Sequence, residues 1–307
     1  MKNYITLDCG TTKTKISLVS NGVVTDSVKI HNETNTDSYK AILKEKISHM
    51  LQSNMLSQKD IIRILATGTM ATAEFGIFPA DYLTVPVNIE NLKNEMCESC
   101  IHEISDIPLC IVRGVKTLCT SLENADTMRG EESELMGIMS CEDNGGVYML
   151  MGSHSKIVKT DENGNITDIC TMLTGELADA LSKATILKHS VSFEESTLDE
   201  EYLKKGYIYC RDKNINEALF KVRVLKNLFG ATPSQTYSFF LGAVLFSDVK
   251  YIIDSNVKKI IVGGNKYLKD AVYVLLKEYA RADVTCLSDS QVENAVALGL
   301  VKIFEYK

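Results

Sequence analysis

A β-hairpin pattern occurs twice in this chain. An apolar strand runs into the loop Gly10-Thr11-Thr12-Lys13, and a second apolar strand runs into Gly152-Ser153-His154-Ser155. Each loop precedes another strand and then an Asn-Gly pair, Asn21-Gly22 in the first copy and Asn163-Gly164 in the second. Asn-Gly is typical of two-residue hairpin turns, because both central positions need a positive φ. The glycines and the Asn-Gly pairs share one offset of 142 positions, which predicts one supersecondary unit present in two copies.

The rest of the chain alternates strands with helices, which is the order of an α/β fold. Helices are predicted over residues 37–51, 133–139, 175–187, 216–229, 234–253, 267–279 and 291–306, with Ser234 as the cap of the fifth. The polar stretch 141–146 predicts a boundary between an N-terminal domain over 1–143 and a C-terminal domain over 144–307. A chain of 307 residues can supply two cores of roughly 150 residues each.

The charge balance argues against nucleic acid as a partner. The chain carries 33 basic and 40 acidic residues, a net charge of −7, whereas nucleic-acid binders usually have a basic excess. No apolar run approaches the roughly 20 residues of a membrane helix, and Asp8 lies where a signal peptide needs its apolar centre. The nine Cys have no framework spacing and fit reduced thiols. We therefore expect a cytoplasmic protein without a nucleic-acid or membrane partner.

The first loop has the residue types of a phosphate site. Gly10 lets the backbone approach a phosphate, Thr11 and Thr12 offer hydroxyl and N–H donors, and Lys13 adds positive charge. Asp8, at the end of the preceding strand, is placed to hold Mg²⁺ through water, since Mg²⁺ keeps much of its hydration shell. Taken alone, the segment is better explained as an ordinary turn with a solvated carboxylate.

Two later glycine turns strengthen the prediction of a nucleotide site. The second loop, with Gly152, Ser153, His154 and Ser155, could meet the phosphates from the other domain. A third turn after a strand, Gly263-Gly264-Asn265, could let a purine ring lie flat against the backbone. Each is an ordinary turn when considered alone, and neither the Walker A pattern nor the dinucleotide fingerprint is present. The three loops together are far more specific than any one of them.

A run of charged residues near the end of the first domain offers a catalytic base. Arg129-Gly130-Glu131-Glu132 precedes a predicted helix, and a carboxylate in the first helical turn is stabilised by the helix dipole. Glu131 suits a base that accepts a hydroxyl proton. Glu132 stays open as the alternative, and a solvated helix start would also explain the pair.

One Cys-x-x-Cys pair, Cys97 and Cys100, lies near His102. A zinc site needs a second pair of ligands, and no residues are spaced to supply it. The sequence favours two reduced thiols on a helix.

Three longer stretches resemble one known family. They are 128–137 with its Arg-Gly-Glu-Glu block, 151–156 with the second loop, and 172–177 with Thr-Gly-Glu-Leu. Together with Asp8 and the glycine loops, they are similar to 2-dehydro-3-deoxygalactonokinase, a sugar-acid kinase of the actin-like, hexokinase-like ATPase superfamily. The similarity runs in order through nearly the whole chain.

The resemblance implies two ribonuclease-H-like domains around a central nucleotide cleft. It implies a kinase that uses ATP and Mg²⁺ to phosphorylate the terminal hydroxyl of 2-dehydro-3-deoxy-D-galactonate, giving the 6-phosphate. Glu131 matches the place of the base in related kinases. The sugar acid would be bound by a loop that contains Thr69, Met70 and Glu74, and its carboxylate by Arg129 and Arg223, because Arg offers a bidentate fork.

The chain departs from the family at three places. Cys9 stands where a Trp is usual, Ser153 replaces a Thr, and residues 72–77 lack the Ser and Trp of the sugar loop while gaining Glu74. The last change leaves a kinase for a different small carbohydrate as an alternative. A non-catalytic ATP-binding regulator is a second alternative, and a homodimer is left open.

Overall fold

The structure is a computed structural model of the chain, and it describes residues 1–32, 35–68, 78–139, 145–193 and 196–307. The fold is α/β and packs as two units. Unit 1 comprises Met1–Asn144, Thr160–Ile169 and Asp289–Lys307, and unit 2 comprises Gly145–Lys159 and Cys170–Ser288. Two segments beyond the predicted boundary at 143/144 thus pack with unit 1: the tip of the second hairpin and the last helix.

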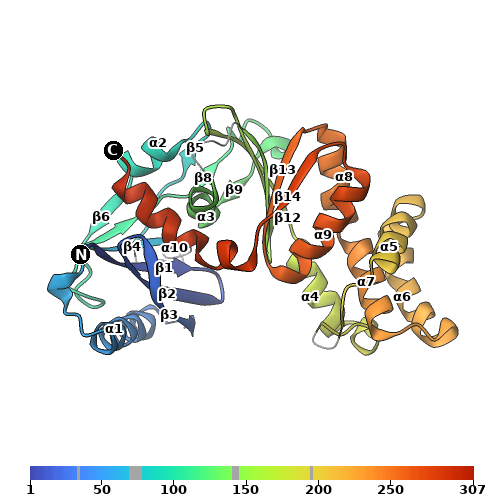
Figure 1. The fold of residues 1–307 in the computed structure, drawn as a ribbon, viewed down its shortest axis with the longest axis horizontal. Coiled ribbons are helices and arrows are strands. Elements are labelled where there is room, and N and C mark those ends of the chain that lie inside the picture. The colour runs from blue at the N-terminus through green and yellow to red at the C-terminus, as the bar shows by residue number, and fades with distance from the viewer. Residues whose placement is uncertain (33–34, 69–77, 140–144, 194–195) are drawn as a thin grey trace. The chain divides into compact units, whose positions relative to one another are not determined.

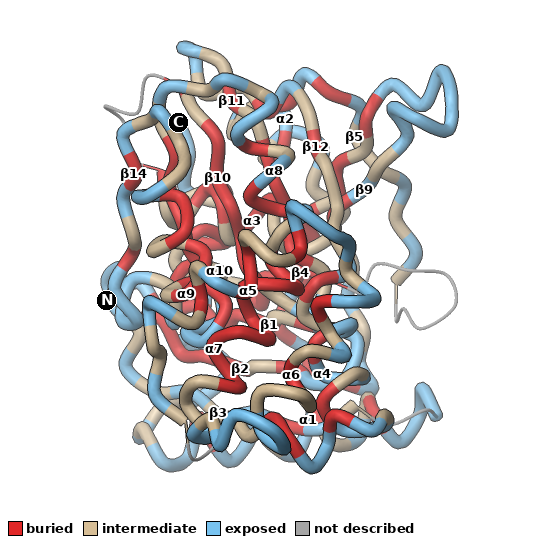
Figure 2. The backbone as a smooth tube through the Cα atoms, turned by 90° about the vertical axis from the view of Figure 1, so that its right-hand side faces the viewer, coloured by how far each residue is buried: buried red, intermediate tan, exposed pale blue. Residues whose placement is uncertain are grey.

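Unit 1 is built on a six-stranded sheet of order β3-β2-β1-β4-β7-β6. The strands are β1 (Asn3–Cys9), β2 (Lys13–Ser20), β3 (Val23–His31), β4 (Arg63–Gly68), β6 (Cys97–Ser99) and β7 (Leu109–Ile111). The first three form an antiparallel meander, whereas β1, β4 and β7 run parallel. Apolar residues of β1 and β4 are almost wholly buried, as the continuous red segments in Figure 2 show.

Helix α1 (Thr36–Ser53) covers unit 1's core with one apolar face. Asn35 caps it, because its side chain accepts hydrogen bonds from the backbone N–H groups of Asp37 and Ser38. The buried positions recur at helical spacing and are Tyr39, Leu43, Ile47, Met50 and Leu51.

Two helices of unit 1 cross at glycines. In α3 (Glu131–Ile138), a Cβ on Gly137 would lie 1.9 Å from Ala295 O of α10 (Asp289–Glu305). In α10, a Cβ on Gly299 would lie 1.8 Å from Ser133 O. The two backbones therefore touch, and α10 runs beside β1 and β4 (Figure 1). The C-terminal helix fixes the orientation of α3.

Shorter elements complete unit 1. They are η1 (Gln58–Asp60), α2 (Ile89–Asn94), η3 (Leu122–Asn124), and a small sheet of β5 (Leu83–Thr84), β8 (Val115–Lys116) and β9 (Thr127–Met128).

Unit 2 repeats the arrangement on a five-stranded sheet of order β12-β11-β10-β13-β14. The strands are β10 (Gly146–Met151), β11 (Ser155–Thr160), β12 (Ile166–Met172), β13 (Lys259–Gly264) and β14 (Asp283–Cys286). A hairpin meander again precedes parallel strands, with β10, β13 and β14 in the places of β1, β4 and β7. The predicted duplication is confirmed.

Helices supply the rest of unit 2. They are α4 (Thr174–Ala184), η4 (Ile186–His189), α5 (Glu200–Asp212), α6 (Ile215–Phe229), α7 (Pro233–Val244), α8 (Phe246–Ser255) and α9 (Lys266–Tyr279). The prediction of one helix capped by Ser234 is wrong. Thr232 is the cap, with Pro233 at the first helical position and Gln235 completing a capping box, and the helix breaks at Leu245.

Among the described residues, no single helix has the length and apolar character to cross a membrane. Only α7 and α8 taken together meet that criterion, and they are bent by 45° at their junction.

Candidate functional site

Equivalent glycines end the central strands of both units beside the two predicted phosphate loops. Gly68 of β4 has φ +87°, and a Cβ there would lie 2.2 Å from Cys9 O. Gly264 of β13 has φ +97°, and a Cβ there would lie 2.3 Å from Met151 O. Both positions require glycine for conformation and for space. Sequence reasoning found Gly264 and missed Gly68, although Gly68 ends the equivalent strand of the first copy.

The first loop joins β1 to β2, whose Cys9 and Thr14 are paired. Gly10, Thr11, Thr12 and Lys13 are all exposed, as a ligand loop requires. The predicted metal-binding Asp8 lies at the end of β1, half-buried. Burial and the negative charge of Glu131 raise the pKa of Asp8 to about 6, while two lysines lower it in part. Asp8 and Glu131 therefore lie close enough to interact.

A third carboxylate, which sequence reasoning did not single out, shares this region. Glu134 is one helical turn after Glu131 on α3, and the spacing i, i+3 places both on one side of the helix. Burial, together with the charges of Glu131 and Asp8, raises the pKa of Glu134 to about 8. The end of β1 and the start of α3 thus form an acidic region.

The two adjacent glutamates have different surroundings. Glu132 is fully buried and accepts hydrogen bonds from Thr67 Oγ1 at 2.6 Å and from Gly130 N at 2.8 Å. Burial raises its pKa to about 7. Glu131 is half-buried, and its Oε2 accepts a hydrogen bond from Arg129 N at 2.9 Å. Glu132 therefore ties the start of α3 to the end of β4, while Glu131 is the more accessible carboxylate.

The second loop is supported by the Thr-Gly-Glu-Leu block at the start of α4. A Cβ on Gly175 would lie 2.1 Å from Gly152 O, so helix and loop are in direct backbone contact. Glu176 N donates to Ser153 O at 2.9 Å, and the Glu176 carboxylate lies 2.8 Å from His154 Nε2. The start of α4 therefore supports the backbone of the second loop.

Two buried polar groups lie in and under the second loop. Ser155 is fully buried, and its Oγ has no hydrogen-bond partner within the described part of the chain. A buried hydroxyl of this kind is available to hydrogen-bond a ligand. Thr174 Oγ1 bonds both carboxylate oxygens of buried Asp248, at 2.8 and 2.9 Å. Burial raises the pKa of Asp248 to about 6.

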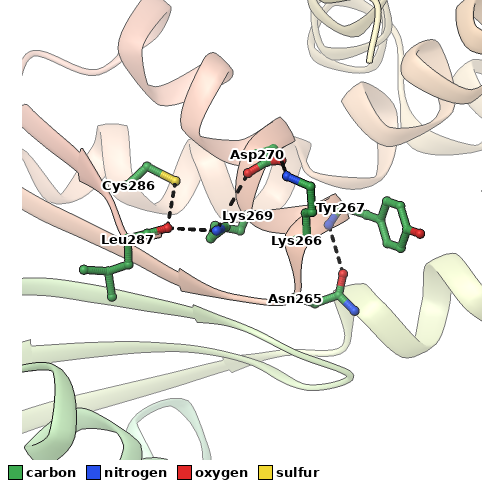
Figure 3. Close-up of polar contacts among 7 residues, drawn as sticks. All are labelled: Asn265, Lys266, Tyr267, Lys269, Asp270, Cys286 and Leu287. Atoms are coloured by element: carbon green, nitrogen blue, oxygen red, sulfur yellow. Dashed lines mark hydrogen bonds and ion pairs between the residues drawn. The ribbon is translucent and has the colours of Figure 1, made fainter. Parts of the chain in front are cut away.

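The predicted adenosine turn opens α9. Asn265 caps the helix by accepting from Tyr267 N at 3.0 Å (Figure 3). One turn later, buried Lys269 donates from Nζ to Leu287 O at 2.8 Å and so anchors the segment after β14 (Figure 3). The backbone turn at residues 263–265 is thus fixed by the Asn265 cap and by the hydrogen bond of Lys269.

The predicted sugar-binding residues fall in different places. Thr69, Met70 and Glu74 lie outside the described residues, as does the departing loop 72–77. In unit 1, the Arg129 guanidinium lies 4.2 Å from the centre of the Tyr82 ring and donates to Ala80 O at 3.2 Å. Arg223 lies on α6 of unit 2, half-buried.

The donors present fit Mg²⁺ better than zinc. Across the described ranges, no group of three or more His, Cys, Asp or Glu is arranged to hold a metal ion. Mg²⁺ needs only one or two carboxylates besides water and substrate phosphates, and Asp8 can supply one. Cys97 and Cys100 are free thiols, with Cys97 on strand β6 and Cys100 just after it, so the prediction of a helical pair is wrong.

A comparison with known families decides the relationship. The chain matches the family described as 2-keto-3-deoxy-galactonokinase over residues 8–303. It belongs to this family. The resemblance inferred from the sequence blocks is confirmed, and the family is one of sugar-acid kinases that use an alcohol group as phosphoryl acceptor.

Two individual proteins with related names are similar to this chain. A protein from Rhizobium meliloti (strain 1021), named "Probable 2-dehydro-3-deoxygalactonokinase", is 38% identical over 68 residues, a stretch that spans 22% of this chain and 22% of the relative. A crystal structure from Sinorhizobium meliloti, described as a 2-dehydro-3-deoxygalactonokinase protein, has a TM-score of 0.77 at 20% identity and covers 98% of this chain and 95% of that one.

More distant structures share the fold. A ROK family glucokinase from Streptomyces griseus, solved with glucose and AMPPNP, has a TM-score of 0.52 at 9% identity, with 98% of each chain covered. The activator of 2-hydroxyisocaproyl-CoA dehydratase from Clostridium difficile, with bound ADPNP, has a TM-score of 0.54 at 13% identity, covering 99% of this chain and 95% of that one. The predicted actin-like α/β fold is confirmed.

Proposed function

We propose that this protein uses ATP to phosphorylate the terminal hydroxyl of 2-dehydro-3-deoxy-D-galactonate, giving the 6-phosphate. The observation that carries the proposal is the family match over residues 8–303, which includes Asp8, the Arg-Gly-Glu-Glu block and the second loop. A cytoplasmic site of action is consistent with the free thiols of the described cysteines.

Phosphoryl transfer asks the protein mainly for positioning and for neutralisation of charge. We assign the β- and γ-phosphates to the loops at Gly10–Lys13 and Gly152–Ser155. Asp8 would hold hydrated Mg²⁺, which supplies positive charge at the phosphate oxygens when bound. The raised pKa of Asp8 supports this role, because a carboxylate crowded by burial and by Glu131 gains from a nearby cation.

Glu131 is the base that we propose for the sugar hydroxyl. It is the more accessible of the two adjacent glutamates, and its backbone contact with Arg129 N orients it at the start of α3. The Glu132 carboxylate accepts hydrogen bonds from Thr67 and Gly130, and it links α3 to β4. Glu131 would accept the hydroxyl proton as the oxygen attacks the γ-phosphate.

Arg129 is the better supported candidate for the substrate's carboxylate. Its guanidinium plane is held over Tyr82 and by Ala80 O, so it is preorganised. Arg223 stays a candidate on sequence grounds alone. The altered loop that contains Glu74 motivates the runner-up, a kinase for a different small carbohydrate on the same fold.

A substrate panel tests the proposal. Purified enzyme with ATP and Mg²⁺ would be offered sugar acids and neutral sugars, with ADP formation coupled to NADH oxidation and the product identified by mass spectrometry and ³¹P NMR. We expect turnover of the 2-keto-3-deoxy acid, at a rate well above that with its carboxylate-free analogue. Turnover of a neutral sugar alone would establish the runner-up, and ATP binding without turnover of any compound would favour a non-catalytic regulator.

A further inference from the structure

One residue outside the recognised motifs holds the first phosphate loop from behind. Asn32 follows β3 directly and is half-buried. Its backbone N–H donates to Thr12 O at 2.9 Å, and its side-chain Nδ2 donates to Gly10 O at 2.7 Å. A single residue therefore engages two carbonyl groups of the loop.

These two hydrogen bonds decide where the loop's donors point. In a planar trans peptide, the C=O and the following N–H point in opposite directions. With the carbonyls of Gly10 and Thr12 turned toward Asn32, the N–H groups of Thr11 and Lys13 point away from it. Those N–H groups are the backbone donors that an anion in front of the loop would meet.

A buried network fixes the orientation of the Asn32 amide. Its Oδ1 accepts from Thr14 Oγ1 at 2.7 Å, and Thr14 is fully buried. Since Oδ1 can only accept, the one hydroxyl hydrogen of Thr14 is committed to it. The hydroxyl of Tyr39 on α1 lies 2.6 Å from Thr14 Oγ1, and the same hydroxyl donates to Cys9 Sγ at 3.3 Å. With Oδ1 assigned to Thr14, Nδ2 necessarily faces Gly10.

We propose that Asn32 is a positioning residue for the nucleotide's β- and γ-phosphates, supported by Thr14 and Tyr39. This role rests on the proposed function, since it presumes that the loop binds ATP. Without the side chain, the Gly10 carbonyl loses the hydrogen bond from Asn32 Nδ2 that directs it away from the phosphates. Nucleotide binding then becomes weaker, because part of the binding free energy is used to reorder the loop.

The test separates phosphate positioning from general stability. Asn32→Ala is compared with Asn54→Ala, since Asn54 is also half-buried in unit 1 and donates two hydrogen bonds from Nδ2, to Asp26 Oδ2 and Met50 O, each at 2.8 Å. Calorimetric titration with a non-hydrolysable ATP analogue and, separately, with AMP gives the affinities at fixed Mg²⁺. Thermal unfolding is followed in parallel.

We expect Asn32→Ala to weaken binding of the ATP analogue about ten-fold and binding of AMP by less than about two-fold. Asn54→Ala should bind both compounds with wild-type affinity. Equal losses for the analogue and AMP, or no loss for either, would overturn the role. Wild-type protein that does not bind the analogue would refute the proposed function itself, which is a distinguishable result.

A second pair of variants guards against misfolding of Asn32→Ala. Thr14→Val removes the hydroxyl that orients the amide, whereas Thr14→Ser keeps it. We expect the valine variant to bind the analogue more weakly and AMP with unchanged affinity. The serine variant should keep wild-type affinity for both compounds. Indistinguishable affinities in these two variants would contradict the network.

Discussion

Gly175 sets how closely α4 packs on the second loop, and one added methyl group there should disable the loop. A Cβ at this position would lie 2.1 Å from Gly152 O and 3.0 Å from Ser153 Cα. Non-bonded contacts settle near 3.5 Å, so the loop must retreat by roughly 1.4 Å. A misplacement of that size can cost on the order of 100-fold in rate, about 2.7 kcal/mol of barrier.

The assay is steady-state kinetics of Gly175→Ala with ATP and the accepted sugar acid, combined with urea unfolding. Global stability should change little while kcat/KM falls, because the partly exposed loop can move away and because Ala favours a helix over Gly by about 1 kcal/mol. Gly206→Ala is the matched control, because a Cβ there would lie 2.0 Å from Phe239 O at a helix contact away from the loop. It should lose stability and keep its rate per folded molecule.

Two results would refute this reasoning. One is a Gly175→Ala enzyme whose kcat/KM stays within about two-fold of wild type, since the loop would then tolerate the displacement. The other is an equal loss of rate per folded molecule in Gly206→Ala, which would mean that any backbone clash in unit 2 impairs catalysis.

Three further predictions concern charged side chains. Glu131→Gln should lower kcat by about 10²–10⁴-fold and leave the KM for ATP nearly unchanged; full activity would return Glu132 to consideration as the base. Lys302 Nζ donates to the carbonyls of Met136 and Met139 at the end of α3. Lys302→Met should therefore lower the unfolding free energy by about 1–2 kcal/mol and also reduce kcat. Unchanged urea unfolding curves would contradict this prediction. The pKa of Asp248 is about 6 in the folded state, above its value in the unfolded chain, so the native state binds more protons. The unfolding free energy should therefore fall by up to about 3 kcal/mol as the pH rises from about 4 to 6. Asp248→Asn should remove that part of the slope, and an unaltered pH dependence of unfolding would show that the carboxyl is not buried as described.

The candidate site illustrates which roles can be read from sequence. Asp8, Gly152 and Gly264 could be predicted because each ends a strand in a recognisable pattern, and residue type at a strand end is a local property. The difference between Glu131 and Glu132 could not be predicted. Both have the same chemistry and adjacent positions, and only the burial of Glu132 against Thr67 and Gly130 assigns it a structural task.

Partners distant along the chain were equally inaccessible. Asn32 follows the first loop by about twenty residues, and its two bonds to that loop depend on how β3 pairs beside β2. Likewise, Gly299 is required by a backbone contact with Ser133 in another helix, and no local signal in α10 indicates it.

The sequence by itself determined the α/β class, the duplicated hairpin, the glycine loops and the family, because strand periodicity, turn chemistry and short motifs are written in consecutive residues. Tertiary structure alone decided which carboxylate is buried, which glycines are required by neighbouring backbones, and which asparagine orients the first loop. Burial, steric contact and hydrogen bonding across elements depend on which segments meet in space, and that is not a property of any one segment.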